Sequence, residues 1–285
     1  MAINASKSGQ VLLGSLKVNR IGFGGMRIVG NQVWGEPKDH ENSIKILKAA
    51  VKLGVNFIDT ADAYGPEVSE NLIHEALHPY DGIVIATKGG LTRPSPAEWV
   101  PDGSSKHLKD AIAGSLERLG VSSINVYQLH SPDPKVPFET SIRTLMELQI
   151  EGKIKHIGLS NVSLNQLKQA TDMCEIVSVQ NRYNVMETKD SDATVDYCTD
   201  HHIAFIPYFP IGGNGTSLRQ LSKLADKYKA TEQQIALAWL LARSPIMLPI
   251  PGTQSMQHLE ENIASSDINL SDTDIDYLNT LAYTK

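Results

Sequence analysis

Short apolar runs recur along the chain, and most of them stop at a polar residue. A strand that is buried on both faces reads as such a continuous apolar stretch. The segment NRIGFGG at residues 19–25 also reads as a buried strand, and with it the chain has eight predicted strands. The other seven are residues 55–64 (VNFIDTADAY), 83–88 (IVIATK), 125–130 (NVYQLH), 154–161 (IKHIGLSN), 176–181 (IVSVQN), 203–208 (IAFIPY) and 246–253 (IMLPIPGT).

Helical periodicity fills the gaps between these runs. Gly54, Gly120 and Gly152 each follow such a segment, and glycine often ends a helix in a left-handed conformation. Ser163 and Thr231 stand where N-caps are expected. The predicted helices are residues 41–53, 69–77, 106–119, 138–150, 163–173, 193–201, 218–228 with 231–243, and 256–264.

The alternation of strands and helices predicts an α/β fold, a (β/α)₈ TIM barrel, because closing the sheet removes both of its edges. Residues 11–18 predict a short N-terminal β-hairpin around Gly14 and Ser15. No composition break divides the chain, so we expect one domain over residues 1–285. The competing arrangement is an open doubly wound sheet. It is disfavoured because no G-x-G-x-x-G motif opens a helix after the first strand.

Composition limits the cellular compartment and the classes of partner that we expect. The chain has 285 residues and a formal net charge of −6 with both signs interspersed, which predicts no nucleic-acid partner. Two cysteines, Cys174 and Cys198, cannot form a disulfide framework and fit a reducing compartment. The start of the chain lacks a signal-peptide pattern, and no run reaches the ~18 apolar residues of a membrane span. We therefore expect a cytoplasmic protein without a membrane partner; oligomeric state is not indicated.

Four polar residues at or just beyond the predicted strand ends form a chemically coherent set: Asp59, Tyr64, Lys88 and His130. Neighbouring strands lie ~5 Å apart, so these side chains can meet. A tyrosine hydroxyl has a reference pKa of about 10 and needs a nearby cation to give up its proton near neutrality. Lys88 can be that cation, held by Asp59. A neutral His130 can donate a hydrogen bond to a substrate oxygen. The set suits protonation of a carbonyl oxygen while a hydride reaches its carbon.

Each member has an ordinary explanation when taken alone. Asp59 can cap a helix, Lys88 can lie on the surface along its aliphatic stem, and His130 can begin a turn. A metal site is a further alternative, with Asp59 and His130 as ligands. It requires three or four convergent ligands, and Lys88 would repel the cation, so we expect no metal. The occurrence of all four residues at one rim favours proton transfer.

Seven motifs in register make the chain resemble the aldo-keto reductase family from about Asn19 to the end. The resemblance implies a (β/α)₈ barrel that reduces aldehydes or ketones with NADPH. It implies Tyr64 as general acid and base, assisted by Lys88 and Asp59, with His130 orienting the carbonyl. The motifs are GVNFIDTADAYGPEVSENLIHEAL, IATK, QLHSPD, GKIKHIGLSNV, VQNRYN, PYFPIGG and IPGTQSMQHLEENIAS.

The same resemblance implies a cofactor site. Tyr208 would stack on the nicotinamide, and the last motif would hold the adenosine 2′-phosphate. Many members carry a lysine and an arginine where this chain has Gly252 and His258, so we expect NADPH, with NADH possible. The implied amide-recognition set is Ser160, Asn161 and Gln180. The other implied contacts are Gly25, Met26, Asp59, Pro210, Gly212, Thr253, Gln254, Glu261 and Asn262.

Substrate contacts are expected from Trp34, Tyr64, Trp99 and His130. The long segment 89–107 is expected to place Trp99 and Arg93 near the pocket opening. The alternative for both residues is ordinary loop packing. The loop WGEP and the motifs PYFPIGG and IPGT resemble the bacterial pyridoxal reductase-like subgroup, which implies a small carbonyl substrate and the conversion of pyridoxal to pyridoxine. The alternative is a non-catalytic NADPH-binding subunit that senses redox state or serves a partner. The complete proton-handling set favours an enzyme.

Overall fold

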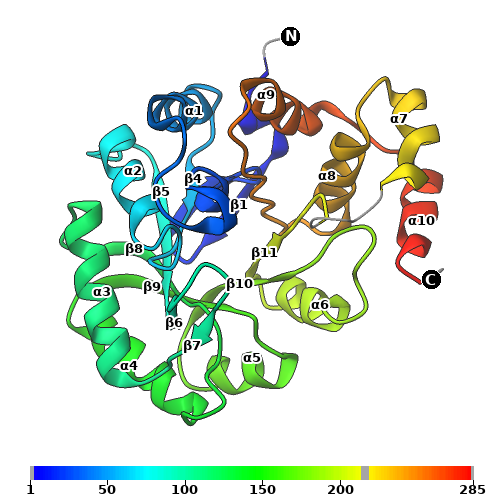
Figure 1. Ribbon diagram of the computed structural model, residues 1–285. Helices are drawn as coiled ribbons and strands as arrows, with labels where there is room; N and C mark the ends of the chain where they lie inside the picture. Colours follow the sequence, from blue (N-terminus) through cyan, green and yellow to red (C-terminus); the bar gives the residue numbers. More distant parts are fainter. Residues whose placement is uncertain (1–2, 213–217, 284–285) are drawn as a thin grey trace.

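The computed structural model describes residues 3–212 and 218–283 and shows a curled parallel sheet surrounded by helices (Figure 1). Over these residues the main sheet has seven strands in the order β11-β10-β9-β8-β5-β4-β3, and every neighbouring pair is parallel. Each strand overlaps a predicted run, although β3 and β4 are much shorter than the runs predicted for them. The strands are β3 (Phe23–Gly24), β4 (Phe57–Asp59), β5 (Val84–Gly89), β8 (Ile124–Leu129), β9 (Ile154–Ser160), β10 (Ile176–Arg182) and β11 (Ala204–Tyr208).

The eighth predicted strand, residues 246–253, is not a regular strand in the described structure, so a complete eight-stranded barrel is not shown. Met247 forms only an isolated parallel bridge with Phe205 of β11. On the other side, the Gly22 N–H donates to the Pro249 carbonyl at 3.0 Å. The segment contains two prolines, which have no N–H to donate, so it cannot build a continuous ladder. It nevertheless bonds to β11 at one end of the sheet order and to the residue directly before β3 at the other.

The helices cover the outside of the sheet, each within a few residues of its predicted range. Ser163 and Thr231 form the predicted N-caps, both in capping boxes, and Gly120 ends its helix with φ 66°. Helix α10 was not predicted. The helices are α1 (His40–Lys52), α2 (Val68–Leu77), α3 (Ser105–Leu119), α4 (Phe138–Ile150), α5 (Leu164–Thr171), α6 (Asp192–Asp200), α7 (Ser222–Tyr228), α8 (Glu232–Arg243), α9 (Met256–Ala264) and α10 (Asp272–Leu281).

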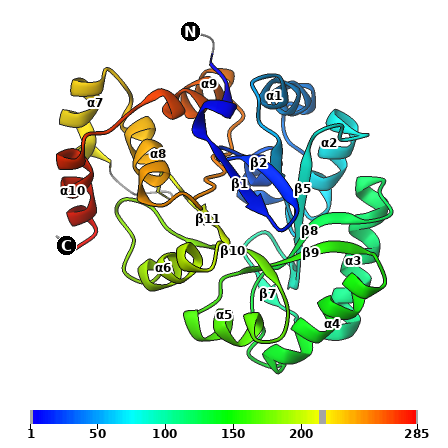
Figure 2. The ribbon, with the colours of Figure 1, turned by 180° about the vertical axis from the view of Figure 1, so that it is seen from behind.

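Two short antiparallel pairs lie apart from the main sheet. Strands β1 (Gln10–Leu13) and β2 (Leu16–Asn19) pair where the N-terminal hairpin is predicted, and Figure 2 shows them in front of the sheet when the molecule is seen from behind. Ser15 Oγ lies 3.1 Å from His156 Nε2, near the start of β9. Strands β6 (Leu91–Thr92) and β7 (Val100–Pro101) form an unpredicted pair in the long loop after β5.

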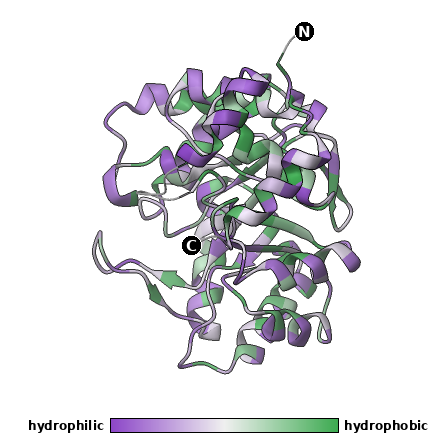
Figure 3. Ribbon diagram, turned by 90° about the vertical axis from the view of Figure 1, so that its right-hand side faces the viewer, coloured by the Kyte–Doolittle hydropathy of each residue, from purple (hydrophilic) through white to green (hydrophobic). Residues whose placement is uncertain are grey.

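The core lies between the sheet and the inner faces of the helices. Hydrophilic residues colour much of the outer helical surface, whereas hydrophobic colour is concentrated inside (Figure 3). Trp239 of α8 is the largest fully buried side chain among the described residues, and its ring stacks on Tyr183 with centroids 5.7 Å apart. Within the described chain, no helix combines the length and the apolar character needed to cross a bilayer.

Candidate active site

Lys88 is the centre of the site, and the structure brings it together with Asp59 and Tyr64. Its ammonium donates to Asp59 Oδ2 at 2.6 Å, to the Thr60 carbonyl at 2.8 Å and to the Tyr64 hydroxyl at 3.2 Å. Lys88 has no solvent exposure. A lysine in such a place is stable only as a paired cation, because a buried charge without partners is very costly. The predicted proton-handling contact between Lys88 and Tyr64 is therefore present.

Strand pairing explains why these residues meet. Asp59 is the last residue of β4 and pairs with Ala86 of β5, so Lys88 follows two positions beyond. Residues two apart on a strand point to the same face. His130 comes directly after β8, and its N–H donates to the Gly89 carbonyl at 2.9 Å, which ties this strand end to β5. The His130 and Tyr64 rings meet edge to face with centroids 5.8 Å apart.

The charges in the site set three protonation states. Burial raises the pKa of the Tyr64 hydroxyl, and Lys88 opposes that increase. Burial lowers the pKa of Lys88, but the neighbouring Asp59 and Tyr64 outweigh it, so the net pKa is above its usual value. Burial, followed by the positive charges of Lys88 and Arg93, holds the pKa of His130 well below 6.5. The site thus contains a protonated tyrosine, a charged lysine and a neutral imidazole at neutral pH.

Gln128 is a site residue that the sequence analysis does not identify. Its Nε2 donates to Asp59 Oδ1 at 2.9 Å, and Gln180 Nε2 donates to the same oxygen at 2.8 Å. Lys88 holds the other oxygen, so both carboxylate oxygens of Asp59 are occupied. The sequence offers one signal for Gln128: it is a polar residue inside an apolar run, two positions before His130, and residues two apart on a strand point to the same face.

The predicted amide-recognition residues also converge. Ser160 ends β9, and Gln180 lies beside it on β10. Asn161 adopts a left-handed backbone with φ 57°, and its Nδ2 donates to the His130 carbonyl at 2.9 Å. The Tyr208 hydroxyl donates to Asn161 Oδ1 at 2.8 Å. Donors, acceptors and one aromatic ring therefore meet beside the proton-handling residues.

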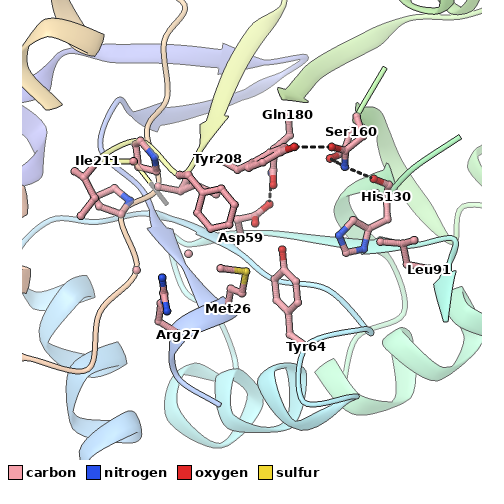
Figure 4. Close-up of a pocket in the computed structure, with 18 of the residues that line it drawn as sticks. Met26, Arg27, Asp59, Tyr64, Leu91, His130, Ser160, Gln180, Tyr208 and Ile211 are labelled. Carbon is pink, nitrogen blue, oxygen red and sulfur yellow. Dashed lines mark hydrogen bonds between the residues drawn. The ribbon is translucent and has the colours of Figure 1, made fainter. Parts of the chain in front are cut away.

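These groups line one pocket with a volume of about 350 Å³ (Figure 4). In the close-up, His130 and Leu91 lie at one end, Arg27 and Ile211 lie at the other, and Tyr64, Asp59 and Tyr208 lie between them. Predicted site residues in the lining are Met26, Asp59, Tyr64, Trp99, His130, Ser160, Asn161, Gln180, Tyr208, Pro210, Gly212 and Gly252. Residues that the prediction does not include are Gly24, Arg27, Leu91, Phe209, Ile211, Ile250 and Pro251.

Some predicted contacts lie elsewhere. A Cβ on Gly25 would lie 2.6 Å from Ser69 Oγ, so Gly25 packs against the start of α2 and not in the pocket lining. Trp34 is also outside this lining; it forms a bridge with Gly65 within the loop cluster. Thr253 and Gln254 line an adjacent groove. The α9 residues His258, Glu261 and Asn262 line neither the pocket nor the groove.

The long loop after β5 places Trp99 against the site, and Arg93 holds it there. The Arg93 guanidinium lies 3.6 Å from the centroid of a Trp99 ring, and the Trp99 and Tyr64 centroids are 6.4 Å apart. Arg93 is buried and does not line the pocket, so it has the loop-packing role. It donates to the carbonyls of Gln32, Val33, Ala63, Pro96 and Glu98.

Metal ligands do not cluster in the part of the chain that the structure describes. Residues 3–212 and 218–283 contain no group of three or more His, Cys, Asp or Glu side chains able to hold an ion. The carboxylate at the centre of the site, Asp59, is paired with Lys88 at 2.6 Å. A carboxylate paired with a buried lysine beside a tyrosine hydroxyl is a donor set that suits proton transfer.

Comparison with known proteins agrees with the geometry. An uncharacterized oxidoreductase of Schizosaccharomyces pombe is 48% identical over 95% of this chain and 89% of its own length. The pyridoxine 4-dehydrogenase of Escherichia coli is 44% identical over 91% of this chain and 93% of its own. A crystal structure of an aldo-keto reductase from Klebsiella pneumoniae in complex with NADPH superposes with a TM-score of 0.79 and 24% identity, covering 93% of this chain and 92% of that one. The model of the Aldo/keto reductase family matches residues 20–282, and the chain therefore belongs to that family.

Proposed function

We propose that the protein is an NADPH-dependent reductase that converts an aldehyde or ketone to an alcohol, with Tyr64 as the proton donor. The observation that carries this proposal is the hydrogen bond of Lys88 to Tyr64, supported by the ion pair of Lys88 with Asp59. When NADPH is bound, it supplies the hydride. Tyr64 gives its hydroxyl proton to the carbonyl oxygen, and Lys88 stabilises the phenolate that remains.

His130 orients the carbonyl in this mechanism. A neutral imidazole can donate one hydrogen bond to the carbonyl oxygen, and the low pKa of His130 keeps the ring neutral. Its Nδ1 is buried and has no hydrogen-bond partner among the described residues. A donor placed beside the developing oxyanion lowers the barrier most when it is already fixed in place. The edge-to-face contacts with Tyr64 and Trp99 fix the ring.

The residues present fit a nicotinamide cofactor. Asn161 and Gln180 offer the donors and acceptors that a carboxamide requires, and the Tyr208 ring lines the same pocket. The hydroxyl of Thr253 and the N-terminus of α9 suit an adenosine phosphate. NADPH in the Klebsiella pneumoniae structure supports this choice. We further infer a (β/α)₈ barrel in which residues 246–253 take the place of the eighth strand.

Pyridoxal is the substrate that we propose, with pyridoxine as the product. The identity to the pyridoxine 4-dehydrogenase of Escherichia coli supports it. Trp99 and Tyr64 give the pocket an aromatic wall that suits a planar ring. The alternative, a non-catalytic NADPH-binding subunit, has no need for the complete set of proton-handling residues.

The test is to mix the purified protein with NADPH and pyridoxal, to follow NADPH absorbance and to identify the product. Propanal and benzaldehyde serve as comparison substrates. Loss of NADPH with formation of pyridoxine supports the proposal. Turnover of the comparison aldehydes without pyridoxal removes the substrate assignment, whereas NADPH binding without turnover of any carbonyl removes the catalytic assignment.

A further inference from the structure

Asp133 is a buried carboxylate beside the site that the proposed mechanism does not use. It comes three residues after His130, in the loop between β8 and α4, and only 9% of it is exposed. Its Oδ1 accepts the Lys135 N–H at 2.8 Å within that loop, whereas its Oδ2 accepts the Gly103 N–H at 3.1 Å. Gly103 belongs to the loop between β5 and α3, which also carries Trp99. One carboxylate therefore joins the loop that follows His130 to the loop that carries Trp99.

The backbone of Gly103 is held from two elements. Its N–H donates to Asp133, its carbonyl accepts the Ser141 hydroxyl of α4 at 2.7 Å, and both hydrogen bonds are buried. A Cβ on Gly103 would lie 2.6 Å from Ser141 Oγ and 3.1 Å from the Asp133 Cβ. Only a glycine lets both partners close on the backbone without a shift. These three residues form a clamp, the Gly103 clamp, that fixes the position of this part of the loop.

The Gly103 clamp lies at the base of the β6–β7 hairpin. Leu91 of β6 pairs with Pro101 of β7, two residues before Gly103. Leu91 and Trp99 both line the pocket, and Trp99 stands directly before β7. In Figure 4, Leu91 lies at the His130 end of the pocket. A displacement at Gly103 would therefore move the part of the pocket lining that the hairpin supplies.

The clamp holds the hairpin to a different neighbour than Arg93 does. Arg93 lies on the Trp99 ring, at 3.6 Å from its centroid, and donates to carbonyls of the loops that follow β3 and β4. Asp133 instead fixes the hairpin to the loop that follows β8. The ring centroids of Trp99 and His130 are 6.3 Å apart. The separation of the indole and the imidazole thus depends on the link through Asp133.

We propose that Asp133 is a positioning residue that holds the Trp99 ring opposite His130 and thereby favours aromatic aldehydes, a proposal that rests on the proposed reductase function. In that function the carbonyl oxygen lies at Tyr64 and His130, so the rest of the substrate extends along the aromatic wall. A wall that is fixed before the substrate binds need not be ordered by it, which strengthens binding of a planar ring. A small aliphatic aldehyde has no ring to pack against Trp99 and should not depend on Asp133.

The test is steady-state reduction of pyridoxal, benzaldehyde and propanal with NADPH by the wild type, Asp133→Asn and Ser141→Ala. Asp133→Asn keeps the size of the side chain, but its amide has one acceptor oxygen for two N–H groups. We expect the KM for the aromatic aldehydes to rise about fivefold in each variant, with the KM for propanal and the affinity for NADPH unchanged. Asp110→Asn, an exposed carboxylate on α3, is the matched control and should behave like the wild type.

The double variant Trp99→Ala/Asp133→Asn separates positioning from a general structural role. If Asp133 acts through the Trp99 ring, Asp133→Asn raises the KM for an aromatic aldehyde no further once that ring is gone. Ser141→Ala reaches the Gly103 clamp from α4 and tests the proposal even if Asp133→Asn does not fold.

Three results would overturn the proposal. They are wild-type KM values for aromatic aldehydes in Ser141→Ala and Asp133→Asn, an equal rise of the KM for propanal, and additive effects in the double variant. All three leave the proposed function intact. A wild-type protein that reduces no carbonyl contradicts the proposed function itself, and this proposal with it.

Discussion

The Lys88 ammonium lies 3.2 Å from the Tyr64 hydroxyl oxygen, in a site where Lys88 has no solvent exposure. Burial makes the tyrosine harder to ionise, and Lys88 is the group that offsets this effect. In the proposed mechanism, the phenolate formed after proton transfer would otherwise be buried without a counter-charge. Proton donation by Tyr64 would therefore depend on Lys88, which in turn depends on Asp59 to remain charged.

Lys88→Met should abolish most of the turnover and reduce stability. Without the ammonium group, the phenolate that forms on Tyr64 is no longer stabilised, and we expect kcat to fall ~10²–10⁴-fold. The Asp59 carboxylate would also be left buried without its ion pair, which costs about 3–5 kcal/mol. Steady-state kinetics and denaturant unfolding measure the two effects. Lys45→Met, on the exposed face of α1, is the control. Wild-type turnover in Lys88→Met would refute the dependence.

Gln128→Met should also lower kcat, but by less than Lys88→Met does. The variant keeps the volume but removes one of the two amide donors to Asp59 Oδ1. Gln128 does not line the pocket, and its shortest side-chain hydrogen bond is the one to Asp59, so we expect kcat to fall by about tenfold, with the KM for NADPH nearly unchanged. Gln128→Glu adds a buried carboxyl group beside Asp59 and should cost more in both activity and stability. Equal effects of the two variants would show that only packing matters at this position.

The strand ends of the site can be predicted from sequence, because each apolar run breaks at a chemically distinctive residue. Asp59, Lys88 and His130 all follow this rule, and parallel strands bring their ends to one edge. Gln128 cannot be predicted in this way, since it stands inside its run and only the neighbouring strand shows that it faces Asp59. The contacts of Arg93 to the carbonyls of Gln32, Val33 and Ala63 cannot be predicted either, because they join segments far apart in the chain.

Two further differences have local physical causes. The last apolar run contains prolines at 249 and 251, so its hydropathy predicts a strand that its backbone cannot pair. Gly25 is a cofactor contact implied only by the family resemblance, yet a Cβ on this glycine would meet Ser69 of helix α2. In both cases, the sequence of the segment alone does not show which groups from distant segments lie opposite it.

The pH dependence of stability should reveal the buried neutral His130. Its pKa is held well below 6.5, whereas the unfolded chain takes up a proton near that value. Below about pH 6.5 the unfolded state therefore binds more protons, and the free energy of unfolding falls as the pH falls, by at most about 1.4 kcal/mol per pH unit. His130→Gln should lose less stability than the wild type between pH 7 and pH 5. If the free energy of unfolding falls equally with pH in the wild type and in His130→Gln, the low pKa of His130 is contradicted.

The Arg93 contacts predict a specificity effect from a residue outside the pocket lining. Arg93→Lys keeps the charge but cannot stack on Trp99 or reach all five carbonyls. We expect the Trp99 ring to be held less firmly beside the pocket. The KM for an aromatic aldehyde should therefore rise by about tenfold, while the affinity for NADPH stays unchanged. Trp99→Ala should show the same selectivity between aromatic and small aliphatic aldehydes. An equal loss for both kinds of aldehyde would remove the aromatic-wall role.

Turnover of Tyr64→Phe with NADPH and pyridoxal tests the proposed mechanism most directly. The substitution keeps the ring that packs against His130 and Trp99 and deletes only the hydroxyl group that Lys88 contacts. If Tyr64 donates the proton, kcat falls ~10²–10⁴-fold while NADPH binds as tightly as to the wild type. Wild-type turnover in this variant would contradict the account.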